Sequence, residues 1–456
     1  MNRRRSEGAG RLGDARLLEL AEAAVGVDGV DDAEALVIRS GGGLTRFADN
    51  RIHQATASED LEVRVRAVVD GNRIGVASTH DMSPDGARDA ARRARGIAMA
   101  MPPDPGYPGM PGPADYPGSV RYDEATAAAS PAERAELVAR VVGQLPAEVQ
   151  AAGALATGET EVALANSNGV RGAYAVTHAG FSILADAGSG TGWAEAIAPT
   201  LGGLDVELLG GRAAEKAVAG RDPRDLEPGV YPVVLEPAAV ATLIDFLGYL
   251  GFSAKSYEEG RSFLTGRLGS QVCSPLVTLR DDGLSLDTVG APFDFEGVPK
   301  RPVTLIDHGV AGTLLHDWRS ALKAGVEPTG HSLPAPSSEG AYPLHLSLDA
   351  GQDGLADLVA GLERGLVVTR FHYTNVVNLM ETSITGMTRD GTFLVEDGKI
   401  VGGVKNLRFT QSILEALAAV TGISRETELI GEDTFGVTRA PALAIEAFNF
   451  SSATTF

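Results

Sequence analysis

Residues 235–269 constrain this chain more than any other stretch. Pro237 can occupy the first position of a helix, where its missing N–H costs no hydrogen bond. The apolar residues that follow recur at helical spacing: Val240, Leu243, Ile244, Leu247 and Leu250. In metallohydrolases, a helix of this kind carries two histidines that bind the metal. Here no His or Cys occurs between Val240 and Tyr257, and the only acid is Asp245. The stretch therefore predicts an apolar helix without metal ligands.

Composition limits the classes of protein that remain. The chain has 456 residues, 44% of them hydrophobic, which is enough for two or three packed domains. The net charge of −21 argues against nucleic acid as the main ligand. No apolar run is long enough for a membrane span, and the basic residues 1–14, which no apolar segment follows, predict a flexible tail. A single cysteine, Cys273, fits a buried thiol in a reducing cytoplasm, where we expect this protein.

Hydrophobic periodicity predicts an α+β fold for the first half. A helical pattern over residues 15–26 precedes a series of alternating segments that ends near residue 78, and helices are predicted at 83–100 and 130–145. The Gly41–Gly43 run is interpreted as one of the turns between these strands. The Pro/Gly-rich residues 101–118 form a long irregular connection, either packed or mobile. Residues 15–221 are therefore predicted to be one domain, an antiparallel sheet with flanking helices.

The second half is predicted to be mostly β. A composition break at residues 222–229 is followed by an almost continuous apolar strand at 230–236. Short alternating segments bounded by Asp-Gly turns dominate the remainder, with helices predicted at 356–364 and 411–421. Residues 222–456 are therefore interpreted as a second, β-rich domain.

Few residues outside the apolar helix indicate chemistry. No two of the eight histidines lie three or four residues apart, so they are interpreted as turn or surface histidines. The adjacent acids Asp281 and Asp282, beside a glycine, are interpreted as solvated turn residues. Residues 370–375, RFHYTN, follow an apolar strand and combine aromatic, titratable and polar groups, which makes them candidates for the lining of a cleft.

Several segments together resemble one known family. They are TRFADNRIHQ at residues 45–54, GRLGSQVCSPLVT at 266–278, DDG at 281–283, PTG at 328–330 and FLVEDGKI at 393–400. The sequence is similar in these places to the TldD/PmbA family, once called modulators of DNA gyrase. The resemblance extends over nearly the whole chain.

This resemblance implies two kinds of subunit. One is a zinc peptidase with a His–Glu–three-residue–His helix and a C-terminal cysteine ligand, and the other, of the PmbA or TldE type, lacks these ligands and pairs with the first. In this sequence the first histidine and the glutamate fall on or near Ile244 and Asp245. The second histidine falls near Tyr249, and the cysteine falls near Phe435. The resemblance therefore implies a PmbA/TldE-like subunit without catalytic residues, metal or other cofactor.

Three hypotheses follow from this comparison. The chain is a non-catalytic subunit that completes a dimer cavity for unfolded peptides, with a histidine-bearing TldD-like partner or with itself. Alternatively, it is a stand-alone biosynthetic enzyme with a repurposed cleft, or a homodimeric peptide-binding protein without catalysis. The resemblance implies that substrates bind as extended strands. The candidate cleft or substrate-contact residues are Asp245, Tyr249, Tyr257, His372, Tyr373 and Asn375.

Overall fold

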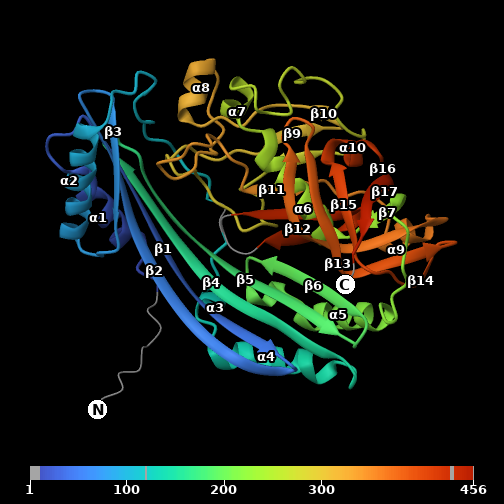
Figure 1. Ribbon diagram of the computed structural model, residues 1–456. Helices are drawn as coiled ribbons and strands as arrows, with labels where there is room; N and C mark the ends of the chain where they lie inside the picture. Colours follow the sequence, from blue (N-terminus) through green and yellow to red (C-terminus); the bar gives the residue numbers. More distant parts are fainter. Residues whose placement is uncertain (1–10, 119–120, 432–435, 455–456) are drawn as a thin grey trace, which may run out of the picture.

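The structure is a computed structural model that describes residues 11–118, 121–431 and 436–454. It contains two sheets, one of six strands and one of eleven (Figure 1). All strands of the six-stranded sheet come from the first half of the chain, and all strands of the larger sheet come from the second half. The predicted α+β class is confirmed.

The elements of the first half are α1 (Asp14–Val25), β1 (Asp32–Ala48), β2 (Arg51–Val69), β3 (Arg73–Thr79), α2 (Pro84–Ala100), α3 (Glu124–Ala127), α4 (Pro131–Gln144), β4 (Gln150–Asn166), β5 (Arg171–Asp186), β6 (Thr191–Ala198), the 3₁₀ turn η1 (Leu201–Gly203) and α5 (Val206–Ala219). The elements of the second half are β7 (Gly229–Leu235), α6 (Pro237–Gly251), α7 (Ala254–Glu258), β8 (Leu279–Asp281), β9 (Val303–Asp307), β10 (Val310–Ala311), α8 (Trp318–Ala324), β11 (His345–Leu348), α9 (Leu355–Ala360), β12 (Arg364–Asn378), β13 (Ser383–Glu396), β14 (Lys399–Gly403), β15 (Leu407–Ser412), α10 (Ile413–Ala418), β16 (Val420–Gly431) and β17 (Val437–Ala453).

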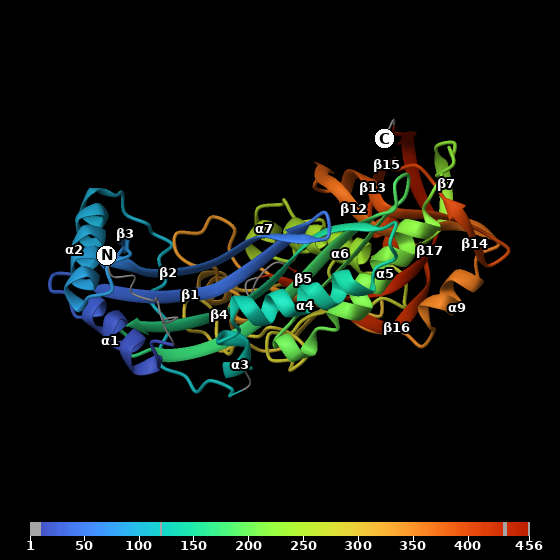
Figure 2. The same cartoon turned by 90° about the horizontal axis from the view of Figure 1, so that it is seen from below.

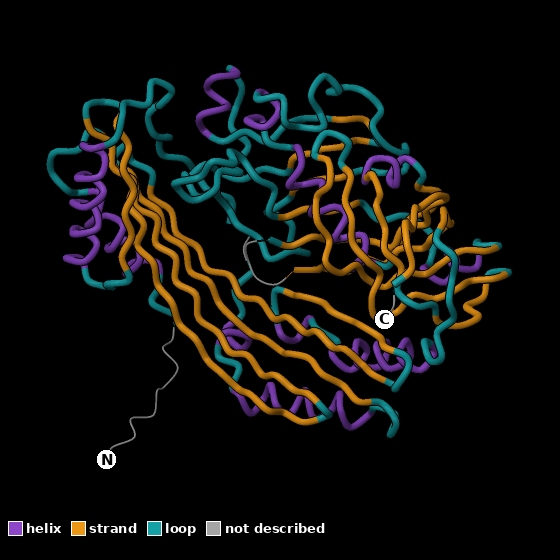
Figure 3. The backbone as a smooth tube through the Cα atoms, viewed as in Figure 1, coloured by secondary structure: helices purple, strands orange, loops and turns teal. Residues whose placement is uncertain are grey.

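The six-stranded sheet is antiparallel, in the order β3-β2-β1-β4-β5-β6. Its long strands run from one end of the sheet to the other (Figure 3). The predicted turn at Gly41–Gly43 is wrong, because β1 continues through it. The glycines serve close packing instead: a Cβ on Gly42 would lie 2.7 Å from the carbonyl oxygen of Thr157, and one on Gly43 would lie 2.1 Å from the guanidinium of Arg134.

Helices cover this sheet near both of its ends (Figure 2). One apolar cluster joins α1 and α2 to β1 and β2, and another joins α4 and α5 to β4, β5 and β6. The sequence sets both helix starts: Ser83 caps α2, and Ser130 with Glu133 forms a capping box on α4.

The larger sheet follows the order β10-β9-β8-β11-β17-β15-β13-β12-β7, and β7 also pairs with β17. This additional pairing closes β17, β15, β13, β12 and β7 into a ring. Phe371, Phe409 and Phe448, one from each of three of these strands, are buried and in mutual ring contact. Residues 411–421 do not form the predicted single helix, because β15 ends at Ser412, which caps the short α10, and β16 begins at Val420.

The two halves share an apolar interface. Residues of β4 and β5 pack against the segment 289–295, and the ring of Tyr174 meets that of Phe293 edge-on with centroids 5.0 Å apart. Of the two alternatives for the connection 101–118, the structure has the packed one: the carbonyls of Met110 and Pro111 accept hydrogen bonds from Asn168 and Asn166.

The predicted N-terminal tail is described only from residue 11 onward. There the backbone N–H groups of Leu12 and Gly13 donate to the buried carboxylate of Glu161, at 2.9 and 2.8 Å. Among the described residues, no helix is long and apolar enough to cross a membrane.

Candidate functional site

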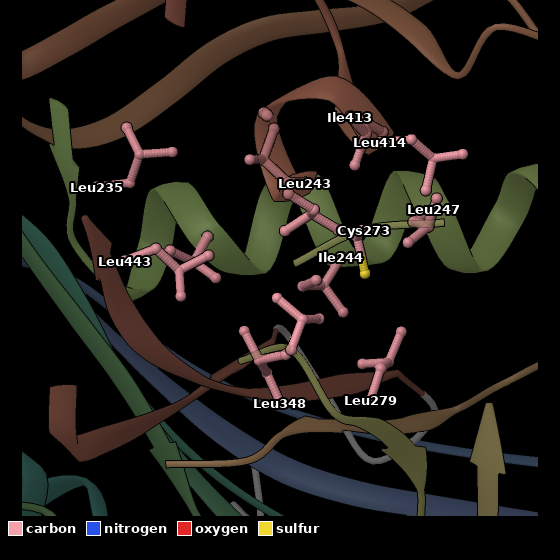
Figure 4. Packing of buried hydrophobic residues seen from close by; sticks show 14 of the residues in the cluster. Leu235, Leu243, Ile244, Leu247, Cys273, Leu279, Leu348, Ile413, Leu414 and Leu443 are labelled. Atoms are coloured by element: carbon pink, nitrogen blue, oxygen red, sulfur yellow. The ribbon is translucent and has the colours of Figure 1, made fainter. Parts of the chain in front are cut away.

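The apolar helix predicted from the sequence is α6, and it lies inside the second half of the chain. Pro237 is in its first turn, and the helix packs against β12 and β17. Leu243, Ile244 and Leu247 are fully buried, in a cluster that also contains Cys273 and Leu414 (Figure 4). Burial raises the pKa of the Cys273 thiol to about 12, so the thiol stays protonated and structural, as predicted.

Asp245 is the one acid on α6, and its side chain is open to solvent on one side. Its carboxylate accepts a hydrogen bond from the hydroxyl of Thr438 on β17. Burial among protein atoms raises the pKa of Asp245 to about 6, and the Thr438 hydrogen bond opposes this rise. Hydration on the open side also favours the charged form. Asp245 is therefore a carboxylate that can change charge near neutral pH.

Two phenols accompany Asp245. Tyr249 lies one helical turn further along α6, on the same face, and is 53% exposed. Tyr342 is half-buried, and its pKa is raised by burial and by the negative charge of Asp245. Tyr342 therefore belongs with this pair, although the sequence analysis did not single it out.

These groups do not fit a zinc ion. Zinc needs three or four nitrogen, sulfur or oxygen donors around one point. At the positions near which the resemblance places the histidine and cysteine ligands, Ile244 points into the apolar core, Tyr249 is exposed, and Phe435 lies outside the described residues. Asp245, at the position of the glutamate, is hydrogen-bonded to Thr438. Within residues 11–118, 121–431 and 436–454, no group of three or more His, Cys, Asp or Glu side chains could hold a metal ion.

The other predicted cleft residues lie elsewhere. Tyr257 is half-buried on α7 against the apolar core. His372, Tyr373 and Asn375 form a separate group on β12: the first two rings lie 4.4 Å apart, and the Asn375 amide donates to the Tyr373 carbonyl at 3.0 Å. In the described part of the chain, no hydrogen bond, ion pair or ring contact joins this group to Asp245. Its role as a substrate-contact group stays a prediction.

The backbone at Tyr373 is unusual. Its φ is +51°, the strand pairing of β12 is irregular between His372 and Asn375, and the side chain is 73% exposed. A bulky aromatic residue in the left-handed region costs free energy, and bulges commonly redirect a side chain. β12 therefore presents Tyr373 to solvent at the expense of local strain.

A buried polar cluster was missed by the sequence analysis. Asp281, interpreted as a solvated turn acid, is fully buried and accepts hydrogen bonds from His331 Nε2 and from the His345 backbone N–H, both at 2.8 Å. Lys300 Nζ lies 3.9 Å from its carboxylate. The interpretation of Asp281 as a turn residue and of His331 and His345 as surface histidines is therefore wrong.

Electrostatics explains how these groups stay buried. Burial by itself would raise the pKa of Asp281, but His331 and Lys300 hold it well below its usual value. Burial lowers the pKa of His345 to about 3, and the positive charge of Lys300 acts in the same direction. The result is a buried carboxylate that accepts a hydrogen bond from His331 and lies beside Lys300, whose own pKa is lowered by burial. No local sequence signal could have found it, because His331 and His345 follow Asp281 by 50 and 64 residues.

Comparison with known protein families supplies the context of the site. Three family models match the chain in succession: PmbA/TldA metallopeptidase domain 1 at residues 33–98, the central domain at 115–221 and the C-terminal domain at 228–452. The chain belongs to the PmbA/TldD metallopeptidase family. The resemblance found in the sequence is thereby confirmed at the level of the family.

Individual relatives of this PmbA/TldD family member are distant. It is 29% identical over 231 residues to a metalloprotease of Methanothermobacter thermautotrophicus, which covers 49% of each chain. It is 25% identical over 400 residues to the metalloprotease PmbA of Escherichia coli O157:H7, covering 82% of this chain and 83% of that protein. The chain spans about half the length of the first curated relatives that it matches.

Solved structures share the fold. TldE from Thermococcus kodakarensis superposes with a TM-score of 0.85 at 22% identity, over 95% of this chain and 99% of that one. A putative modulator of a DNA gyrase from Thermotoga maritima gives 0.79 at 22% identity, over 95% and 98%. At this identity the likeness establishes the common fold.

Proposed function

We propose that this chain is a TldE-like, non-catalytic subunit, which combines with a histidine-bearing TldD-type subunit to process unfolded peptides. In this proposal, residues 15–221 and 222–456 are the two domains that help to enclose the shared cavity. The observation that carries the proposal is α6, where Ile244 is buried in the core and Asp245 is hydrogen-bonded to Thr438. The likeness to TldE of Thermococcus kodakarensis supports the same conclusion.

α6 contains no histidine or cysteine that could bind a zinc ion. A zinc peptidase needs the metal to lower the pKa of the attacking water and a base to accept its proton. Asp245 could accept a proton, but the positions of the metal-binding donors fall at or near Ile244, Tyr249 and Phe435, which include no histidine or cysteine. Peptide-bond hydrolysis in the complex is therefore assigned to the partner.

The test is reconstitution with a histidine-bearing family member. The two chains are co-expressed, co-purified and assayed on an unfolded peptide, with each chain alone as a reference. We expect cleavage that requires both chains and that is lost when the partner's metal-binding histidines are replaced. Unchanged cleavage after this chain is left out would refute the proposal.

A stand-alone enzyme with a repurposed cleft is the second candidate, and the raised pKa of Asp245 beside Tyr249 and Tyr342 favours it. Asp245→Asn removes the titratable group and keeps the shape. If the isolated chain turns over a substrate and this variant does not, the second candidate replaces the first. A homodimer that binds peptide without cleaving it would be recognised by peptide binding and self-association in the absence of any partner.

A further inference from the structure

A cavity of about 190 Å³ lies at the junction of the two halves of the chain. It is lined by β6 and α5 of the first half, and by the start of α6 and parts of β12, β16 and β17 of the second half. Pockets for drug-sized ligands usually measure about 300–1,000 Å³, so this cavity suits a smaller molecule. None of Asp245, Tyr249 and Tyr342 lines it, so the cavity is separate from the group around Asp245.

The lining of this cavity is acidic. Four glutamates and two cations contribute to it: Glu195, Glu236, Glu426, Glu428, Arg212 and Lys216. The two cations already form ion pairs with Glu428 and Glu236. Glu426 pairs with Arg425, which lies outside the lining and is exposed, so solvent weakens this pair. Four carboxylates against two cations leave the lining with a net charge of −2, which favours a positively charged ligand.

A buried hydroxyl in the wall of the cavity lacks a hydrogen-bond partner. Thr369 on β12 is 2% exposed and lines the cavity, and its Oγ1 makes no hydrogen bond within the described structure. Buried polar groups are normally hydrogen-bonded, so this hydroxyl indicates a ligand that supplies the missing partner. The oxygen of a hydroxyl can accept a hydrogen bond from an ammonium group, which agrees with the negative charge of the lining.

Two N–H groups at this cavity lack an acceptor. The indole N–H of Trp193 on β6 makes no hydrogen bond within the described structure. Ala238 is in the first turn of α6, where a backbone N–H has no acceptor inside the helix, and no described side chain caps this helix. Arg370 stacks over the Trp193 ring at 3.8 Å, and its charge is balanced by Asp390. An oxygen acceptor on the ligand would satisfy these donors.

These features together select one class of ligand. The rest of the lining is largely apolar, with Ala194, Pro237, Leu355 and Ala442. A metal ion does not fit, because within residues 11–118, 121–431 and 436–454 no three His, Cys, Asp or Glu side chains are grouped to hold one. A small anion is opposed by the excess of carboxylates. A small organic cation with an apolar group and an oxygen acceptor matches the charge, the N–H donors and the apolar wall.

We propose that this cavity binds a small α-amino amide, in which an ammonium group stands next to a neutral carbonyl and a short apolar side chain. The ammonium group donates to Glu195 and to the Thr369 hydroxyl. The carbonyl oxygen accepts from the N–H of Trp193 or Ala238, and the apolar side chain packs against Leu355. A free amino acid is less suitable, because its carboxylate would add a further negative charge to an acidic lining. The proposal goes beyond the proposed function and does not depend on it.

The test uses the full chain and three probes of similar size. Leucinamide has the ammonium group and the neutral carbonyl, leucine has a carboxylate in place of the amide, and N-acetylleucinamide has no charge. Binding is measured by isothermal titration calorimetry at pH 6.5, where an α-amino group is largely charged. We expect saturable binding of leucinamide at one site per chain, with leucine and N-acetylleucinamide each weaker by about tenfold or more.

A substitution and a matched control locate the ammonium group. Glu195→Gln removes one negative charge from the lining and should weaken leucinamide binding about tenfold. Glu381→Gln removes the same charge at an exposed position outside the lining and should change the affinity less than about twofold.

Thr369→Val separates a binding role from a structural one. Valine keeps the shape of threonine and removes the hydroxyl, which has no partner in the described structure. Leucinamide binding should therefore weaken about fivefold or more, while the free energy of unfolding in urea should be no lower than that of the parent protein. A structural role of the hydroxyl would lower the stability and leave the affinity unchanged.

Absence of saturable leucinamide binding would overturn the proposal, as would equal affinities for leucinamide and N-acetylleucinamide. Equal affinities of the Glu195→Gln and Glu381→Gln variants would exclude this cavity as the site. Circular dichroism of each variant establishes that the fold is intact. Because these titrations need neither a partner chain nor cleavage, their outcome is separate from that of the reconstitution test.

Discussion

Acidification should destabilise this protein through His345, and the structure gives the size of the effect. The side chain is 3% exposed on β11 and is faced by Lys300, Asp281 and His331. Its pKa is about 3 in the folded state, against 6.5 for an exposed imidazole, mainly because burial disfavours the charged form. As the pH falls below 6.5, the unfolded chain therefore binds a proton that the folded chain does not.

The expected loss follows from this difference in proton binding. Stability rises with pH wherever the unfolded state holds more protons, and each pH unit between the two pKa values is worth about 1.4 kcal/mol per group. From pH 7 to pH 5, His345 alone should lower the free energy of unfolding by about 2 kcal/mol. The pKa of His331 is also lowered by burial, so it adds in the same direction. The pKa of Asp281 is depressed in the folded state, so its protonation lowers the free energy of unfolding only when the pH falls below 3.8, the pKa of this group in the unfolded chain.

Urea unfolding at pH 7 and pH 5 measures the effect. We expect His345→Gln to lose about 2 kcal/mol less than the parent protein over this interval, whatever its stability at pH 7. His53→Gln, at an exposed position of β2, is the matched control and should behave as the parent does. The reasoning is refuted if the His345→Gln variant and the parent lose the same free energy of unfolding.

Three further outcomes are expected. Gly43→Ala should destabilise the protein by about 1–3 kcal/mol in urea unfolding, because its Cβ would meet the guanidinium of buried Arg134. Gly180→Ala, with nothing within 4 Å of the added Cβ, is its control, and equal effects would contradict the packing argument. Tyr373→Gly should raise the melting temperature slightly, since glycine accepts φ +51° without strain and the lost side chain is exposed; a lower melting temperature would show that the ring stabilises the fold. After dialysis against buffer without chelator, elemental analysis should find zinc well below one atom per chain, and Asp245→Ala should leave that amount unchanged; stoichiometric zinc lost in the variant would contradict the account of α6.

The sequence predicted those helices whose formation depends on residues close together in the chain. The capping residues Ser83 and Ser130 begin α2 and α4 as expected, and the apolar spacing of residues 240–250 forms the buried helix α6. Such signals need only the chemistry of one or two turns, so a single sequence reveals them. The family resemblance then gave the context that periodicity alone could not give.

The failures concern properties that arise from distant residues. Gly41–Gly43 looked like a turn because the neighbours that require small residues there, Thr157 and Arg134, lie more than 90 positions away. Asp281 looked solvated for the same reason, since its partners are contributed by later segments. A glycine or an acid can have either role, and only the tertiary contacts decide between them.

The packing of α6, rather than a bound metal, accounts for the stability of this helix. Its buried positions are aliphatic, and burial of each such side chain contributes about 1.5–3 kcal/mol, so packing on β12 and β17 holds the helix without any metal. A helix fixed in this way supports β12 and β17 whether or not chemistry occurs at Asp245. The stability of this fold therefore does not depend on catalysis, and a binding role alone is compatible with it. The proposed non-catalytic role therefore predicts cleavage that depends on a partner chain rather than turnover by the isolated chain.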